Sequence, residues 1–146
     1  MPQWSRLIAS FLIHINFMST QKRKFGDLGE KLACKFLKNN GYAVLEVNYQ
    51  KRIGEIDVIA KLKKVIHFIE VKTRTESSAN IFGLPQEAVS FQKKKKLIRT
   101  AIFYLAEHKL SDDAIWQIDV IAITINQDKT KAKINHIENA VSYDSL

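Results

Sequence analysis

Two β-strands and a short turn are encoded in the stretch Gly54-Glu-Ile-Asp-Val-Ile-Ala-Lys-Leu-Lys-Lys-Val-Ile-His-Phe-Ile-Glu-Val-Lys72. Both halves are rich in β-branched and apolar residues, and charged side chains interrupt each half at alternate positions. We expect strands over residues 53–60 and 65–74, joined by a link short enough for an antiparallel hairpin. Because side chains alternate between the two faces of a strand, the charged residues of each strand share one face.

A two-residue turn at Lys63-Lys64 sets the register that we expect for this hairpin. Asp57 then lies opposite Glu70, and Glu55 lies opposite Lys72, so one face of the sheet carries three carboxylates and one ammonium group. The turn has no Asn-Gly pair, which makes this register a hypothesis. Any register of the same parity still brings these four side chains onto one face.

The charged face has two interpretations. Asp57 and Glu70 repel each other at close range unless a cation or a shared proton offsets the repulsion. Carboxylates on a rigid sheet are the hard oxygen ligands that Mg²⁺ prefers, and Lys72 beside them can hold a water molecule or a phosphate oxygen. In the alternative, the charges form a ladder of cross-strand salt bridges on a solvated face, which is common on exposed sheets. The pattern alone gives the two interpretations about equal weight.

A known signature matches these residues. Asp57, a gap of twelve residues and then Glu70-Val71-Lys72 resemble the PD-(D/E)xK signature of the restriction endonuclease-like nucleases. The chain resembles the YraN family more closely, a bacterial family of predicted endonucleases related to archaeal Holliday junction resolvases. In chain order, the matching residues are Gly29-Glu30, Gly41-Tyr42, Asn48, Arg52, residues 54–57 and 70–74, Ala88-Val89, Lys93 and Asp119-Val120. Gln117 departs from the family pattern, in which an arginine is expected.

The order of the predicted elements is typical of an α/β fold. Beside the central pair of strands, we expect helices over residues 25–40 and 85–107, strands over residues 42–47, 114–125 and 131–137, and a long loop over residues 73–83. The resemblance implies the same arrangement, a restriction endonuclease-like αβββαβ core with a central mixed sheet flanked by helices. Residues 25–140 are expected to form one domain, preceded by an extension and basic linker at 1–24 and followed by a tail at 141–146.

The resemblance implies a DNA endonuclease that depends on Mg²⁺ or Mn²⁺. Asp57, Glu70 and the carbonyl group of Val71 are the implied metal ligands, and Lys72 is the residue that orients the attacking water. Glu55 would assist by holding a second metal, a water molecule or Lys72 itself. Glu30 has the same implied role.

The residues themselves leave alternatives for the supporting positions. Glu30 stands three residues after Asp27, so it would complete a capping box if a helix begins there. Arg52, Arg74 and Lys93 are expected to contact phosphate groups, and the alternative is that they are ordinary solvated charges. Asp119 lies within an apolar strand, where pairing with a basic residue is more expected than catalysis.

Composition narrows the class of protein. The chain has 146 residues, enough for one domain with a sizeable core, a net charge of +8 and an isoelectric point near 9.6. This charge favours a polyanionic partner, first nucleic acid and second an acidic membrane, over a basic protein without such a partner. Cys34 is the only cysteine, so no intrachain disulfide can form and a reducing compartment fits. We expect Cys34 to be a buried structural thiol, and no cluster of cysteine and histidine suggests zinc.

The N-terminal segment is unusual for a nuclease. The apolar run at residues 7–17 is too short to span a bilayer and lacks a clear cleavage site, so we expect no stable membrane insertion. The segment is either an extension that packs or anchors, or a stretch upstream of a true start at Met18, and we favour the second. A cytoplasmic location is expected.

Four functions remain open from the sequence. The leading hypothesis is a metal-dependent endonuclease, and the similarity to junction resolvases implies branched DNA and a symmetric homodimer. The alternatives are a nucleic-acid-binding protein without catalysis, an RNA-cleaving nuclease, and an acidic-lipid surface protein that uses residues 7–17.

Overall fold

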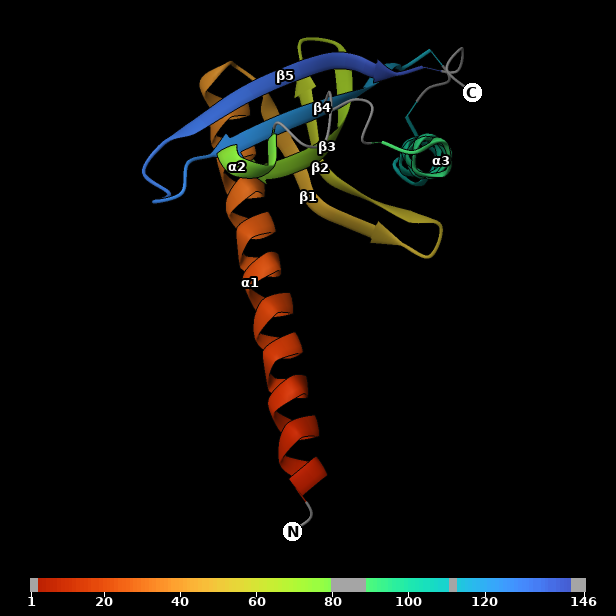
Figure 1. Ribbon diagram of the computed structural model, residues 1–146. Helices are drawn as coiled ribbons and strands as arrows, with labels where there is room; N and C mark the ends of the chain where they lie inside the picture. Colours follow the sequence, from red (N-terminus) through yellow and green to blue (C-terminus); the bar gives the residue numbers. More distant parts are fainter. Residues whose placement is uncertain (1–2, 80–88, 111–112, 143–146) are drawn as a thin grey trace.

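A computed structural model describes residues 3–79, 89–110 and 113–142, with side chains from residue 20 onward. The elements are α1 (Gln3–Asn39), β1 (Ala43–Lys51), β2 (Gly54–Leu62), β3 (Val65–Thr75), α2 (Glu76–Ala79), α3 (Phe91–Glu107), β4 (Ile115–Ile125) and β5 (Ala132–Val141). The strands form one mixed sheet in the order β1-β2-β3-β4-β5, in which β3 and β4 are parallel and the other neighbours are antiparallel. The predicted α/β class, with a central mixed sheet flanked by helices, is confirmed (Figure 1).

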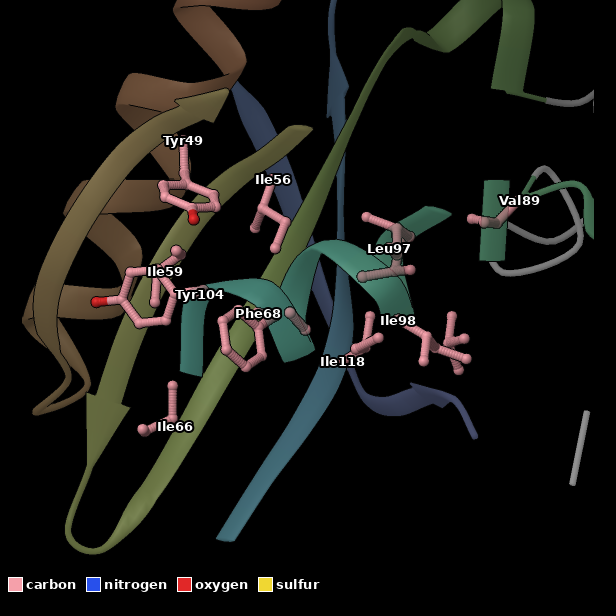
Figure 2. Close-up of a cluster of buried hydrophobic side chains, with 13 residues drawn as sticks. Tyr49, Ile56, Ile59, Ile66, Phe68, Val89, Leu97, Ile98, Tyr104 and Ile118 are labelled. Carbon is pink, nitrogen blue, oxygen red and sulfur yellow. The ribbon is translucent and has the colours of Figure 1, made fainter. Parts of the chain in front are cut away.

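Apolar side chains fill the space on both faces of the sheet. On one face, Ala33 and Leu37 of α1 pack against alternate residues of the central strands, such as Val58 and Ile121. On the other face, α3 contributes Leu97, Ile98, Ala101 and Tyr104 to a second cluster, which also contains Phe68 and Ile118 (Figure 2). Burial of such side chains is the main favourable contribution to folding. The sheet is therefore the middle layer between two helices, and its central strands are buried on both faces.

The hairpin between β2 and β3 has the predicted register. Leu62 pairs with Val65, and Val58 pairs with Ile69, so Lys63 and Lys64 form the turn. Lys63 has a φ of 53°, a left-handed conformation that two-residue hairpin turns require. The pairing ends at Val58 and Ile69, just before the predicted site residues.

The first helix is longer than expected. It begins at Gln3 and continues without a break to Asn39, so the basic residues at 21–24 belong to the helix and do not form a linker. The expected N-cap at Asp27 is wrong for the same reason, and the capping-box interpretation of Glu30 is excluded. Figure 1 shows the N-terminal part of α1 extending away from the sheet as a single rod. Within the described residues, no helix combines the length and the hydropathy needed to cross a membrane.

The second long helix begins later than expected. Ser90 is its N-cap, with extended backbone angles, and its side-chain oxygen accepts a hydrogen bond from the backbone N–H of Lys93. The predicted start at Pro85 is wrong, because a helix running on from there would include Val89 and Ser90, which are not helical. Pro85 itself lies outside the described residues.

The other boundaries differ by a few residues. The strand β3 continues to Thr75 and α2 follows it, so the first part of the loop expected at residues 73–83 is regular structure. Residues 80–83 lie outside the described part. The strand β1 extends to Lys51, which places Arg52 and Ile53 in the turn that leads into β2. The strand β5 extends to Val141.

Candidate active site

The strands β2 and β3 stop pairing at Asp57. Continuing their register would pair Ile56 with Val71, but the backbone N–H of Val71 instead donates to Oδ2 of Asp57 at 2.7 Å. The alternation along β2 is also interrupted, because Ile56 and Ile59 both pack under α3 while Val58 packs under α1. The carboxylate of Asp57 therefore accepts a hydrogen bond from a backbone N–H group of β3 that does not pair with β2. Asp57 lies where the two strands separate.

The first helix touches the sheet at the same place. A Cβ atom added to Gly29 would lie 1.8 Å from Oγ1 of Thr73, so the backbone of α1 lies directly against β3. Only glycine permits such an approach, which brings the neighbouring Glu30 toward the strand carboxylates. The charge of Glu30 contributes to raising the pKa of Asp57. This contact explains the Gly29-Glu30 motif, although the two residues lie within the helix and do not begin it.

Glu70 is the centre of an ion-pair cluster. It is buried in β3, and its Oε1 lies 3.2 Å from Nζ of Lys72 and 3.5 Å from Nζ of Lys93. Lys93 also lies 3.7 Å from Oε1 of Glu55, which is exposed on β2. The predicted opposition of Glu55 and Lys72 is not realised, because the strands no longer pair there and Glu55 contacts α3 instead.

The carboxyl group of Asp57 is strongly perturbed. Burial raises its pKa to about 7, and the neighbouring charge of Glu70 contributes in the same direction. The N–H of Val71 and the ammonium group of Lys93 lower the pKa of Asp57, but they do not offset burial and the charges of Glu70 and Glu30. Two carboxylates in a buried site repel each other, so a cation bound between them would be stabilised.

The donor set fits a divalent cation. Oε2 of Glu70 is buried and has no hydrogen-bond partner, the only such side-chain oxygen or nitrogen found among the described residues. An unpaired carboxylate oxygen inside a protein costs free energy that a bound cation would offset. Asp57 and Glu70 supply hard carboxylate oxygens, which suit Mg²⁺ and Mn²⁺. The backbone of Val71 lies beside them through its hydrogen bond to Asp57.

The three predicted phosphate-binding residues lie on different elements. Lys93, on the first turn of α3, is in direct contact with Glu70. Arg52 lies in the exposed turn that precedes β2, and Arg74 is half-buried near the end of β3. The structure thus brings Asp57, Glu70, Lys72 and Lys93 together, with Glu55 and Glu30 at the margin.

A second polar cluster lies under α1 and joins Asp119 to two histidines that the sequence analysis did not single out. Oδ2 of Asp119 lies 2.7 Å from Nδ1 of His67 and 2.8 Å from Nε2 of His136. The expected basic partner of Asp119 is therefore a pair of histidines, one on β3 and one on β5. His67, Asp119 and the exposed Glu138 are also the one group in the described part of the chain whose geometry would allow three such side chains to share an ion.

The hydrogen bonds of this cluster are already satisfied. Oδ1 of Asp119 accepts from the side chain of Gln117 and from the backbone N–H of Asn139, both at 2.8 Å. Burial raises the pKa of Asp119, but the hydrogen bonds from His136, Asn139, His67 and Gln117 together lower the pKa below its ordinary value. The cluster therefore stabilises an ionised carboxylate that joins three strands. Gln117, where the resemblance led us to expect arginine, contributes a side-chain hydrogen bond to it.

Cys34 was expected to be a buried thiol, but it is only partly buried. The thiol is half-buried on α1, and burial raises its pKa. It lines a groove of about 630 Å³ between α1 and β1, together with Glu30 and Lys38. A raised pKa means that the thiol stays protonated and unreactive at neutral pH.

Comparison with known proteins places the chain in a family. Residues 29–123 match the uncharacterised protein family UPF0102. A UPF0102 protein of Alkaliphilus oremlandii is 43% identical over 118 residues, which cover 81% of this chain and 97% of that protein. A UPF0102 protein of Caldanaerobacter subterraneus is 45% identical over 82% of this chain and 95% of its own length. One from Clostridioides difficile is 44% identical over 79% and 94%. The resemblance drawn from the motifs is thereby confirmed, and the chain belongs to the UPF0102 family, also known as YraN.

Proposed function

We propose that this protein is a metal-dependent endonuclease that hydrolyses phosphodiester bonds in DNA. The observation that carries the proposal is the buried Oε2 of Glu70, for which the described residues supply no hydrogen-bond partner. Next to Glu70 stands a second carboxylate, Asp57, whose pKa is raised to about 7. A carboxylate pair of this kind, with a lysine 3.2 Å away, suits a divalent cation and a water nucleophile. The motif resemblance supports the same reaction.

Each residue of the site has a role in this proposal. Asp57 and Glu70 would hold Mg²⁺ or Mn²⁺ through carboxylate oxygens, and Val71 would do so through its carbonyl group. The bound ion would supply charge stabilisation at the scissile phosphate and a water of lowered pKa. Lys72 would hold the attacking water and offset negative charge in the transition state.

Glu30 and Glu55 would have supporting roles at this site. Glu30 on α1, whose charge raises the pKa of Asp57, would position a water or a second cation. Glu55 keeps Lys93 near the site through its ion pair.

The substrate assignment rests on charge. A net charge of +8 favours a polyanion, and we propose that Arg52, Arg74 and Lys93 contact its phosphate groups, since Lys93 lies 3.5 Å from Glu70. We propose DNA, with branched or junction DNA as the preferred structure in recombination or repair, and a cytoplasmic location. A symmetric homodimer would follow, because two related strands need two related sites.

The decisive experiment is a cleavage assay. Labelled four-way junction, flap, duplex and single-stranded DNA, together with matched RNA, are incubated with Mg²⁺, Mn²⁺ or EDTA. Wild type is compared with Asp57→Ala and Lys72→Ala, and Lys133→Ala on the far edge strand β5 is the matched control for loss of one lysine. We expect metal-dependent cleavage of DNA that falls at least about 100-fold in both site variants and is unchanged in the control.

The other outcomes separate the alternatives. Binding of nucleic acid without cleavage under every condition would favour a binding protein that uses the acidic cluster only structurally. Cleavage restricted to RNA would assign the site to RNA. Cleavage by Asp57→Ala at the wild-type rate would remove Asp57 from the mechanism and point to a contaminating nuclease.

A further inference from the structure

A pocket of about 460 Å³ lies beside the acidic site. It is lined by the turn between β1 and β2 and by the first turns of α3. A Cβ added to Gly54 would lie 2.5 Å from Oγ1 of Thr100, so the strand lies directly against α3 and the two walls are in contact. Proteins hold small ligands in pockets of about 300–1,000 Å³, so this one is large enough for a nucleotide unit.

The lining of the pocket suits phosphate. Of the lining side chains that the structure describes, four are cationic and one is a carboxylate. Lys51 is already paired with Glu107. Arg52 and Lys96 are exposed, and neither forms an ion pair with any residue in the described ranges. Among the lining side chains in the described part of the chain, none is aromatic, so these residues favour contact with phosphate over stacking on a base.

Lys93 connects the pocket with the acidic site. It lines the pocket, and its Nζ lies 3.7 Å from Glu55 and 3.5 Å from Oε1 of Glu70. Lys72 contacts the same oxygen of Glu70 at 3.2 Å, so two ammonium groups neutralise one buried carboxylate. A cation bound to Glu70 would repel both ammonium groups, and the pocket is the open space into which Lys93 can turn.

We propose that this pocket binds the backbone phosphate of the nucleotide next to the scissile bond, and that Lys93 couples phosphate binding there to metal binding at Glu70. The inference rests on the proposed function. Recognition is of the phosphate and is independent of base sequence. Phosphate in the pocket draws Lys93 away from Glu70 and strengthens metal binding, and metal at Glu70 releases Lys93 toward phosphate, because coupling between two binding sites is reciprocal.

The first test measures the pocket without metal. Binding of a labelled single-stranded DNA oligonucleotide is followed by fluorescence anisotropy in EDTA over a range of salt concentrations. The double variant Arg52→Ala/Lys96→Ala is compared with wild type and with Lys133→Ala. Loss of two phosphate contacts should reduce the slope of log affinity against log salt by about 1.4, whatever the base sequence. The pocket is overturned if the slope of the double variant equals that of wild type. It is also overturned if the slope falls by no more than twice the change seen in Lys133→Ala.

The second test measures the coupling. Affinity for Mg²⁺ is determined by titration calorimetry with and without the oligonucleotide, whose integrity is checked on a gel. We expect the oligonucleotide to raise the affinity of wild type for Mg²⁺ about fivefold or more, and Lys93→Gln to abolish this increase. Lys94→Gln on the same helix is the control and should retain it. Equal coupling in wild type and Lys93→Gln overturns the role of Lys93.

These outcomes are distinct from failure of the nuclease proposal. If wild type cleaves nothing but the pocket variants lose affinity and salt dependence, the pocket binds phosphate in a protein that is not a nuclease. If wild type cleaves and the pocket variants bind like wild type, the nuclease stands and the pocket is overturned.

Discussion

At the scale of single residues, Asp57 links the stability of the fold to its chemistry. Its pKa of about 7 lies above the ordinary value of 3.8, so the folded state binds the proton more tightly than the unfolded state. The resulting stabilisation is fully present below about pH 4, and it is lost as the pH rises toward and through 7. At pH 8 the ionised Asp57 therefore destabilises the fold in the absence of a cation.

This pH dependence of stability gives a prediction for Asp57→Asn. At pH 8 in EDTA, the free energy of unfolding of the variant should be about 1–3 kcal/mol higher than that of wild type. The reason is that a neutral amide replaces a repelled carboxylate and its oxygen can still accept the hydrogen bond from the N–H of Val71. At pH 5 the difference should be smaller. The measurement is urea unfolding followed by circular dichroism.

The same samples test the cation. Adding Mg²⁺ should raise the stability of wild type and leave that of Asp57→Asn unchanged, because only a ligand that binds the folded state stabilises it. If Asp57→Asn is less stable than wild type at pH 8 in EDTA, Asp57 is a structural acceptor and its repulsion by Glu70 is not the dominant effect.

At the same scale, the sequence allowed part of the site to be predicted. The two-residue turn and the register that brings Asp57 near Glu70 followed from local properties of the chain, whereas the break in alternation at Asp57 did not. The contact of Lys93 with Glu70 was not derivable in this way, because it joins β3 to α3 across residues 80–88. The histidine partners of Asp119 were also not predicted, since His67 lies 52 residues from it in the sequence and no local pattern marks such a pair.

At the scale of elements, the packing of α1 on β3 depends on one glycine. Gly29→Ala would place a methyl group 1.8 Å from Oγ1 of Thr73, so the helix or the strand would have to move. The better helix propensity of alanine contributes at most about 1 kcal/mol, whereas overpacking costs about 1–3 kcal/mol. We therefore expect net destabilisation in urea unfolding, with reduced affinity for Mg²⁺, because Glu30 moves with the helix.

The same helix provides the control for this prediction. A Cβ at Gly26 would meet nothing within 4 Å, so Gly26→Ala should stabilise the protein by about 0.5–1 kcal/mol. Replacing Thr73 by Ala should recover part of the loss in Gly29→Ala, since the nearest atom is the threonine hydroxyl. Equal stabilisation by both glycine substitutions would contradict the close contact.

The boundaries of the elements depended on competing local signals. Strands with continuous apolar character, such as β4, were predicted within one residue. The start of α1 was missed because residues 3–25 contain neither glycine nor proline, so nothing in them stops a helix that begins near the N-terminus. For α3, Pro85 and Ser90 are both start signals, and the hydrogen bond from Lys93 to the hydroxyl of Ser90 shows which one caps the helix.

At the scale of the whole molecule, the sheet order is what a meander followed by a helical crossover gives. The antiparallel run β1-β2-β3 and the parallel neighbour β4 agree with the element order, because short links favour antiparallel neighbours and a helix-length link permits a parallel one. The length of α1 follows from no such rule, since the order of the elements does not fix where a helix begins.

The last prediction concerns that length. Among the described side chains of α1, those that pack in the core under the helix are Phe25, Leu28, Leu32, Ala33, Cys34, Phe36 and Leu37. Because the N-terminal part of α1 extends away from the sheet (Figure 1), a variant lacking residues 1–17 should keep its urea midpoint, with a free energy of unfolding within about 0.5 kcal/mol of the full chain. It should also keep its affinity for nucleic acid, because Arg6 is the only residue removed with a formal charge, leaving +7 of the original +8.

Binding to vesicles of acidic lipid, measured by co-sedimentation, completes this test. Equal binding by the full chain and the shortened variant would exclude residues 7–17 as a membrane anchor, and it would assign any affinity for lipid to the basic surface of the domain. Loss of vesicle binding on truncation, with unchanged cleavage or binding of DNA, would instead give the N-terminal part of α1 a function separate from the site. A large fall in stability would show that this part of the helix packs on the domain.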